Sequence, residues 1–401
     1  MKILFLSSVL PHSRVVSGSI IIHHRIRMLA ERGHEVGLAC FADEDERLYV
    51  PDLQPFLIEC ETLDPPTPRS RGTRILDYAI NPVPSAFRAL RSQEMRRMVG
   101  RMIERTHYDV VIAEFSVMGQ YLHRNTYLPA VRRIVSCHSC HTRAHRNDVI
   151  LNPISPQTVI RSIRATGLAS YEFAMYRSAD HVLTLTNAER ISLLDLAPEL
   201  HVSVIPYGVD INHFQPSGNG RENIVMFSGY FYDEPNADAA IWFTRTVWPE
   251  LSRRFPELNL YFVGRAPTPA MLDAARRDHR IVVTGEVEDM SPYLRRASAF
   301  VCPMRMGTGF RGKILQAMAC GVPVVSTSLG AQGFRARTGD NILLADTPRT
   351  MLHSLELLLS DPQLRQNISR SAREIVQSRY SWTYCVDRLE DVLNEVVTVQ
   401  N

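Results

Sequence analysis

The sequence predicts an α/β protein built from two doubly wound parallel sheets, and two patterns carry this prediction. Short apolar runs alternate with amphipathic helix patterns from residue 2 to residue 205, and the alternation starts again at residue 224. Strands that alternate with helices in this way form parallel sheets covered by helices. With 401 residues, the chain is also longer than one ordinary hydrophobic core.

We therefore expect an N-terminal Rossmann-like domain at 1–210 and a second one at 223–380. The stretch between them, 211–222, contains Pro216, Gly218 and Gly220 and reads as a linker. A last helix pattern, 382–397, lies within a segment at 381–401 that we expect to cross back to the first domain.

Composition excludes several classes of protein. The chain is 45% hydrophobic and 22% charged, which is ordinary for a globular protein, and a net charge of +3 gives no reason to expect nucleic-acid binding. No apolar run is long enough to span a bilayer, and residues 1–12 lack a small-residue cleavage site. We therefore predict a cytoplasmic protein whose seven cysteines, mostly in apolar runs, stay reduced.

The first domain opens with a strand at 2–7, a loop at 8–19, a helix at 20–32 that ends at Gly33, and a strand at 36–41. This is a βαβ unit. Gly18 stands immediately before the helix, so the loop can face an anion. The loop is not G-x-G-x-x-G, and we predict no nicotinamide cofactor.

Two segments of the first domain are candidates for substrate contact. Residues 51–84 contain seven prolines and read as an irregular segment, a candidate wall of an acceptor site. A helix is predicted at 87–104, and residues 88–105 hold six arginines against two glutamates. One interpretation is a helix packed on the sheet with a solvated basic face. The other is contact with anionic lipid head groups at the inner membrane face, or with an acidic acceptor.

The rest of the first domain is predicted to contain strands at 108–114, 131–136, 181–186 and 202–205, with helices at 162–177 and 189–196. The segment 137–147 follows the strand at 131–136, at its carboxyl end. Its residues Cys137–His141 match the haem-attachment pattern C-x-x-C-H. Haem attachment requires export, and a zinc site would draw on a second Cys/His pair, which the sequence lacks. We predict neither group, and no metal.

The second domain repeats the alternation. Its expected strands are 224–228, 258–263, 281–284, 297–302, 322–327 and 341–345, and its expected helices are 237–253, 271–277, 292–297, 310–319, 350–359 and 361–378.

The most informative stretch of the second domain is 302–330. A buried strand leads into a loop with glycines at 307 and 309, then a helix at 310–319, then another strand. Such a loop offers free backbone N–H groups and a positive helix end to an anion. Arg311 and Lys313 add formal charge, so we predict an anion site at the carboxyl ends of these strands.

Four segments, in order along nearly the whole chain, resemble the family 4 retaining glycosyltransferases of the GT-B fold. They are the opening βαβ unit with Arg32-Gly33-His34-Glu35-Val36, then 205–210 (IPYGVD), 281–298 (IVVTGEVEDMSPYLRRAS) and 309–327. Residues 233–249 resemble the branch found in bacterial polysaccharide biosynthesis. The resemblance implies two Rossmann-like domains facing across a cleft. It also implies transfer of a sugar from a nucleotide-diphosphate donor, with retention of configuration, to a glycan, lipid-linked or small-molecule acceptor. No metal or other cofactor is implied.

The resemblance also implies roles for particular residues. His138 would contact the transferred sugar, with His141 as the fallback, and Arg311 and Lys313 would hold the diphosphate. The expected donor-binding residues are Gly18, Gly285, Glu286, Val287, Thr308, Gly309, Phe310 and Gln316, of which Gly285–Val287 would face the base and Gln316 the ribose.

The chain departs from this family at several of these positions. Where relatives carry two glutamates separated by seven residues, this chain has Thr308 and Gln316. Gln316 can still accept hydrogen bonds, without the charge assistance of a carboxylate. Residues 229–240 also lack the Arg and Lys that many relatives place there. These departures leave an alternative, a non-catalytic GT-B protein that binds a nucleotide sugar or a partner.

Overall fold

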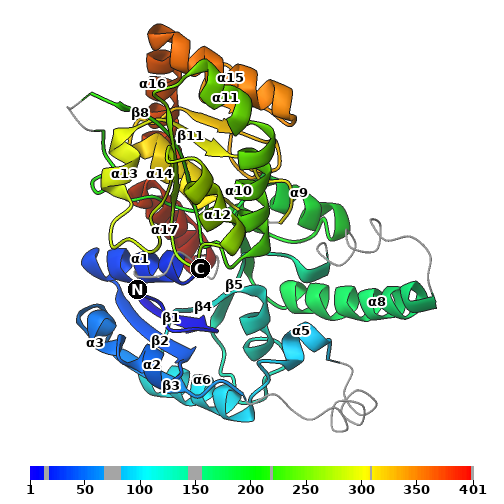
Figure 1. Cartoon of the computed structure of the whole chain (residues 1–401). Coiled ribbons are helices and arrows are strands. Elements are labelled where there is room, and N and C mark those ends of the chain that lie inside the picture. Colours follow the sequence, from blue (N-terminus) through cyan, green and yellow to red (C-terminus); the bar gives the residue numbers. More distant parts are fainter. Residues whose placement is uncertain (13–17, 67–82, 143–155, 217–219, 308, 399–401) are drawn as a thin grey trace. The chain divides into compact units, whose positions relative to one another are not determined.

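The chain folds into two compact units, shown in a computed structural model (Figure 1). The structure describes residues 1–12, 18–66, 83–142, 156–216, 220–307 and 309–398. Unit 1 comprises Met1–Pro206 and Val386–Asn401, and unit 2 comprises Tyr207–Cys385. Each unit is an open α/β sheet whose strand pairs are all parallel in the described residues, so the predicted fold class is confirmed.

The sheet of unit 1 has seven strands in the order β3-β2-β1-β4-β5-β6-β7. The chain moves outward from β1 in one direction and then returns to continue from β4 in the other. The point between β1 and β4, where the order reverses, is where open α/β sheets bind ligands. The strands are β1 (Lys2–Ser7), β2 (Glu35–Phe41), β3 (Glu59–Leu63), β4 (Val110–Glu114), β5 (Arg132–Cys137), β6 (His181–Thr184) and β7 (Val202–Val204).

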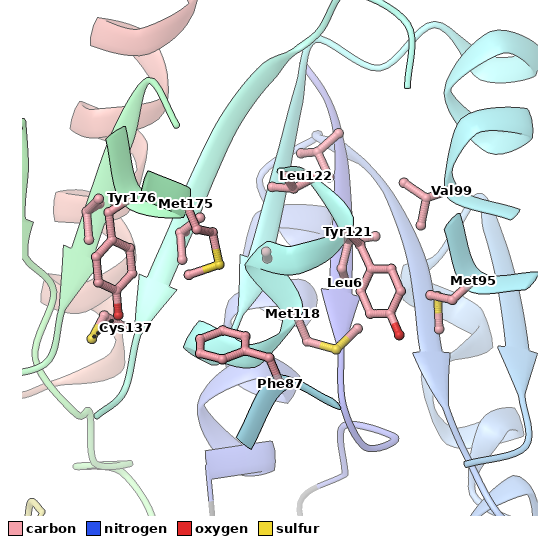
Figure 2. Close-up of a cluster of buried hydrophobic side chains, with 14 of the residues drawn as sticks. Leu6, Phe87, Met95, Val99, Met118, Tyr121, Leu122, Cys137, Met175 and Tyr176 are labelled. Carbon is pink, nitrogen blue, oxygen red and sulfur yellow. Dashed lines mark hydrogen bonds between the residues drawn. The ribbon is translucent and has the colours of Figure 1, made fainter. Parts of the chain in front are cut away.

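Helices cover this sheet, and each helix buries one of its own faces. In Figure 2, Met95 and Val99 of α6 (Gln93–Thr106), the arginine-rich helix, point toward Met118, Tyr121 and the sheet, and all four side chains are fully buried. Burying a side chain of this size stabilises the fold by about 1.5–3 kcal/mol. The helices described in unit 1 are α1 (Gly18–Glu31), α2 (Glu44–Arg47), α3 (Val50–Leu53), η1 (Gln54–Phe56), α5 (Ser85–Arg88), α6 (Gln93–Thr106), η2 (Ser116–Tyr121), α8 (Pro156–Arg177) and α9 (Asn187–Leu196).

Two predictions for unit 1 need correction. The segment 51–84 is not wholly irregular, because β3 pairs in parallel with β2 at the edge of the sheet. Its sequence, ECETL, is mostly polar and its side chains are half-buried, so it lacks the apolar run of a central strand. The helix expected at 87–104 is two helices. The first, α5, ends at Arg88, and Ser92 caps the start of α6 by accepting a hydrogen bond from the Met95 N–H at 3.1 Å.

The sheet of unit 2 has six strands in the order β10-β9-β8-β11-β12-β13, with the reversal between β8 and β11. The strands are β8 (Glu222–Ser228), β9 (Asn259–Val263), β10 (Ile281–Val283), β11 (Ala297–Cys302), β12 (Val324–Ser326) and β13 (Leu343–Leu344). The described helices are α10 (Glu234–Thr246), α11 (Trp248–Arg254), α12 (Pro269–Arg277), α13 (Ser291–Arg296), α14 (Gly312–Ala319), α15 (Pro348–Ser360) and α16 (Pro362–Arg379).

Two helix predictions in unit 2 are also corrected. The helix expected at 237–253 begins earlier, at Glu234, and divides into α10 and α11 on either side of Val247. Pro249 has no N–H to continue the first helix and suits the first turn of a new one. The helix expected from residue 310 begins at Gly312, because Arg311 has non-helical dihedral angles.

The helix α17 (Trp382–Thr398) begins in unit 2, which ends at Cys385, and continues in unit 1 from Val386. Its part in unit 1 is held to the rest of that unit by ion pairs and hydrogen bonds. Glu390 accepts hydrogen bonds from His34 Nε2 at 2.9 Å and from Arg32, and Arg32 also pairs with Asp387 at 2.7 Å. The Arg32-Gly33-His34 motif therefore has a structural role, anchoring a segment 358 residues further along the chain.

We expect the substitution Glu390→Gln to lower the free energy of unfolding by about 1–2 kcal/mol at pH 7, because it removes the charge that Arg32 and His34 face. Burial acts to raise the pKa of Glu390, and the hydrogen bonds from His34 and Arg32 outweigh it and lower that pKa. The contribution is therefore present above pH ~4.3 and is lost as the pH falls through the folded-state pKa.

Urea unfolding at pH 7 and at low pH measures this effect. The matched control is Asp391→Asn on the same helix, which removes only the exposed pair with Arg388 and should change stability by less than about 0.5 kcal/mol. Equal unfolding of the two variants at pH 7 would contradict a structural role for Glu390.

Candidate functional site

The candidate site in unit 2 centres on Lys313, in the first turn of α14. Its ammonium donates hydrogen bonds to the Ser228 carbonyl at 2.6 Å and to Asn236 Oδ1 at 2.8 Å, and lies 4.5 Å from the centre of the Phe227 ring. Ser228 is the last residue of β8, so the cation sits where the strand order reverses. Lys313 and Lys2 are the only lysines in a chain with 45 lysines and arginines in total.

Burial determines the chemistry of this amine. Taking the ammonium out of water, with the Arg311 charge nearby, lowers the pKa of Lys313 to about 8. A cation that has lost much of its hydration interacts more strongly with an incoming anion than an exposed lysine does. Lys313, predicted from the sequence as an anion ligand, is thus a desolvated cation at the end of β8.

The segment Asp233–Asp238 supports the loop before α14. Asn236 also donates through Nδ2 to the Tyr230 carbonyl at 2.9 Å, so one amide joins this segment to Lys313. Asp238 pairs with Arg305, whose guanidinium lies 5.5 Å from the centre of the Trp242 ring. Sequence analysis placed these residues in a family branch and missed their role. The signal was the side-chain pattern Asp-x-x-Asn-x-Asp at the start of a helix, opposite a basic loop.

The loop itself approaches α10 closely enough to require glycine. Gly307 and Gly309 have φ angles of 91° and 93°, and a Cβ on Gly307 would lie 2.9 Å from an Arg311 guanidinium nitrogen and 3.2 Å from the Pro235 ring. Arg311 is the N-cap residue of α14 and caps nothing with its side chain. Thr308, predicted to face the donor sugar, lies outside the described residues.

Backbone contacts join the loops after β8, β9 and β10. A Cβ on Gly264 would lie 2.0 Å from the Gly229 carbonyl oxygen, and the Gly264 N–H donates to the Gly285 carbonyl at 3.1 Å. Gly285 has a φ of 72°. Beyond it, Glu286 and Val287 line an open pocket of about 510 Å³ with Tyr293 and Arg296. The structure thus connects the predicted base-facing residues to the end of β8 through a continuous glycine-lined edge.

The remaining predicted residues of unit 2 lie on or beside α14. Gln316 is half-buried one turn after Lys313, and no described residue bonds to its side-chain amide. The Phe310 ring stacks on Tyr207, with centroids 5.6 Å apart and planes at 15°. Since this ring is held in an aromatic cluster, Phe310 can offer a ligand its backbone rather than its side chain.

In unit 1, Gly18 and His138 come together at the carboxyl edge, where the strand order reverses. A Cβ on Gly18 would lie 3.3 Å from His138 Nδ1 and 2.5 Å from the Phe115 ring. The Phe115 and His138 rings are themselves 4.4 Å apart. His141, the fallback, turns elsewhere: its backbone N–H donates to Glu172 at 3.0 Å and its ring lies against Phe87.

A buried ion pair that sequence analysis missed fixes the His138 ring. His138 Nε2 lies 2.8 Å from Glu114 Oε2, and Arg25 bonds to Glu114 Oε1 at 2.6 Å and to Ser136 Oγ at 3.1 Å. Burial acts to raise the pKa of Glu114, but Arg25 and His138 outweigh it and lower that pKa to about 2. An ionised Glu114 keeps the proton on Nε2 and leaves Nδ1 facing the Gly18 side. The signals in the sequence were Glu114 at the end of an apolar strand pattern and Arg25 among the apolar residues of the first helix pattern.

Metal-binding and membrane-spanning features are absent from the described residues. No group of three or more His, Cys, Asp or Glu side chains there could hold a metal ion. No helix in that part of the chain is long and apolar enough to cross a bilayer.

Comparison with solved structures identifies the fold. A sucrose-phosphate synthase from Thermosynechococcus elongatus matches with a TM-score of 0.71 at 18% identity, covering 100% of both chains. HepE from Anabaena, solved with UDP, matches with a TM-score of 0.71 at 17% identity, covering 98% of this chain and 100% of HepE. The two parallel sheets and these neighbours define a GT-B fold.

The family follows from sequence models. "Glycosyltransferase Family 4" matches residues 19–213, and "Glycosyl transferases group 1" matches 222–361. The chain is therefore a family 4 glycosyltransferase of the GT-B fold. A phosphatidyl-myo-inositol mannosyltransferase from Mycolicibacterium smegmatis is 30% identical over 211 residues, 48% of this chain and 54% of that protein. A D-inositol 3-phosphate glycosyltransferase from Saccharomonospora viridis is 26% identical over 326 residues, 73% and 71% of the two chains.

The ionisation of Lys313 can be measured directly, because the chain has only two lysines. In protein labelled with [13Cε]lysine, we expect one of two signals to titrate with a midpoint of about 8, since burial lowers the pKa of Lys313. Lys313→Arg identifies the signal by removing it. A midpoint near the ordinary lysine value of about 10.4 would show that the amine is hydrated.

Proposed function

We propose that this protein transfers a sugar from a nucleotide-diphosphate donor to a glycan, lipid-linked or small-molecule acceptor, with retention of anomeric configuration. The observation that carries the proposal is the placement of Lys313. Its ammonium joins the end of β8 to Asn236, beside the glycine loop and the first turn of α14. A diphosphate there would meet a desolvated cation and free backbone N–H groups.

The comparisons supply further support for the donor class. HepE was solved with UDP and with UDP-glucose, and the two curated relatives are named as glycosyltransferases acting on inositol compounds. Those names describe those proteins. From them we extend to this chain only the donor class, a nucleoside diphosphate sugar. The proposed acceptor is still a glycan, a lipid-linked molecule or a small molecule.

In the proposed mechanism, the charged groups act when the bond to the diphosphate breaks. Arg311 and Lys313 stabilise the negative charge that develops on the leaving diphosphate, assisted by the backbone of Gly309 and Phe310. Gln316 contacts the ribose, and Gly285, Glu286 and Val287 face the base. In unit 1, we assign His138 to contact with the transferred sugar and Gly18 to contact with the phosphate. We assign no residue as a covalent nucleophile or as a metal ligand.

The absence of Arg and Lys from residues 229–240 fits this assignment. Many relatives place cations in that loop, whereas here the cation reaches the same strand end from α14. The Lys313 ammonium is bonded to the Ser228 carbonyl, the last group of β8. We infer that Lys313 supplies the charge that the loop lacks.

A thermal-shift panel of UDP, GDP, ADP, dTDP and CMP tests the function. We expect one nucleoside diphosphate to raise the melting temperature of the wild type and not of Lys313→Ala, because only the bound native state is stabilised. In turnover with the matching sugar nucleotide, Lys313→Ala should lose about 2–4 kcal/mol of transition-state stabilisation. Since the protonated amine binds the anion, the shift should decline above pH ~8. No shift with any nucleotide at millimolar concentration would contradict the proposal.

We expect Gln316→Glu to tighten donor binding. A carboxylate would accept the ribose hydroxyl bonds with charge assistance, which roughly doubles the strength of each bond. Isothermal titration with the nucleotide found above measures the change. Gln363→Glu, an exposed substitution on α16, controls for the added negative charge. Weaker binding by Gln316→Glu alone would place the ribose elsewhere.

We also propose peripheral contact with anionic membrane through α6. Its apolar side is buried against the sheet, and Arg97 and Arg101 are exposed beside Tyr127 in a shallow pocket of about 400 Å³. Contact would therefore be electrostatic rather than by insertion. Sedimentation with phosphatidylglycerol vesicles at low salt should carry down the wild type and not Arg97→Glu/Arg101→Glu. Equal sedimentation of both would contradict a role for α6.

A further inference from the structure

Two neighbouring tyrosines form an exposed aromatic surface at the carboxyl edge of the unit 2 sheet. Tyr232 is 79% exposed and Tyr230 is 36% exposed, and their rings stack with centroids 5.8 Å apart and planes at 24°. The Arg265 guanidinium lies 4.2 Å from the centre of the Tyr230 ring. Large aromatic rings are costly to leave in water, so a pair displayed together at a binding edge marks a ligand surface. We call Tyr230, Tyr232 and Arg265 the tyrosine shelf.

The backbone under the tyrosine shelf is firmly held. Phe231, between the two tyrosines, is fully buried against Phe227 and Phe262. Its N–H donates to the Arg265 carbonyl at 3.0 Å, and the Tyr230 carbonyl accepts from Asn236 Nδ2 at 2.9 Å. Because the buried phenylalanine anchors the loop, the backbone that carries the two neighbouring rings is held in place. Ligand binding to such a preorganised surface costs little ordering entropy.

The backbone that carries the tyrosine shelf lies one side chain away from the proposed diphosphate site. The same Asn236 amide that holds the Tyr230 carbonyl accepts a hydrogen bond from Lys313 Nζ at 2.8 Å. The shelf and the proposed diphosphate site therefore belong to one connected segment at the end of β8. In a sugar nucleotide, the sugar is bonded directly to the diphosphate, and the base is separated from it by the ribose.

We propose that the tyrosine shelf binds a pyranose ring, an inference that rests on the proposed function. The C–H face of a pyranose packs on the flat face of a phenol, and the hydroxyls at its rim can bond to the tyrosine OH groups and Arg265. The ring is either the donor's transferred sugar or the first sugar of the acceptor. Both sources present the same chemistry to the shelf.

Calorimetry with UDP, UDP-glucose, GDP and GDP-mannose tests the donor source. For the wild type, the sugar nucleotide should bind more tightly than its nucleoside diphosphate. Tyr232→Ala should weaken the sugar nucleotide about five- to tenfold and leave the nucleoside diphosphate unchanged, as expected for the loss of one ring contact. Tyr232→Phe keeps the ring face and should bind within about twofold of the wild type.

The matched control is Tyr127→Ala. Tyr127 is 43% exposed and also lies near an arginine, with the Arg97 guanidinium 5.6 Å from its ring, but it belongs to unit 1 beside α6. It should bind all four nucleotides like the wild type. Equal weakening of a nucleoside diphosphate and its sugar nucleotide by Tyr232→Ala would place the base on the shelf and overturn the proposal.

An acceptor source is tested by saturation-transfer NMR with methyl α-D-mannopyranoside and methyl α-D-glucopyranoside, in the presence of the nucleoside diphosphate that binds. The wild type should give transfer to the sugar ring protons, and Tyr232→Ala should lose it. If Tyr232→Ala matches the wild type in both experiments, the shelf binds no pyranose. If the wild type binds no nucleotide at all, the proposed function fails, and the shelf proposal, which rests on it, fails with it.

Discussion

The hydrogen bond from Lys313 to the end of β8 organises the candidate site of unit 2. One ammonium links α14, β8 and the start of α10, and Asn236 extends the link to the Tyr230 loop. Lys313 is 85 residues from Ser228 and 77 residues from Asn236 along the chain, so this polar cluster joins α14 to a segment far from it in the sequence. The ammonium satisfies the carbonyl at a buried strand end, and under the proposed function its third N–H is the donor for the diphosphate.

In unit 1, a buried ion pair fixes the position of a candidate site residue, His138. Arg25 comes from α1, Glu114 ends β4 and His138 directly follows β5, and the first two are almost fully buried. Buried pairs cost desolvation and are weak contributors to stability, but they fix geometry. Here the result is a histidine of defined orientation and proton position beside Gly18. In each unit, a polar side chain is therefore held where the strand order reverses. In unit 2 the neutral amide of Asn236 holds Lys313, and in unit 1 the Arg25–Glu114 ion pair holds His138.

The sequence predicts the fold well because its signals are local and periodic. Alternating apolar runs and helix patterns identified the two sheets, and the glycine loop before α14 was the basis for predicting an anion site there. The errors arose where local signals mislead. The edge strand β3 is mostly polar, Ser92 and Pro249 interrupt patterns that look continuous, and Arg311 delays the start of α14. Contacts such as Arg25–Glu114 could not be predicted, because residues 89 positions apart become partners only through the strand order.

The division of the chain has a consequence for synthesis on the ribosome. Unit 2 is continuous from Tyr207 to Cys385, whereas unit 1 needs Val386–Asn401 in addition to its first 206 residues. Asp387 and Glu390, the partners of Arg32 and His34, lie on α17 and are translated after the whole of unit 2. Unit 1 therefore begins to emerge before unit 2 and is completed only after it. While unit 2 is being translated, Arg32 and His34 lack these carboxylate partners.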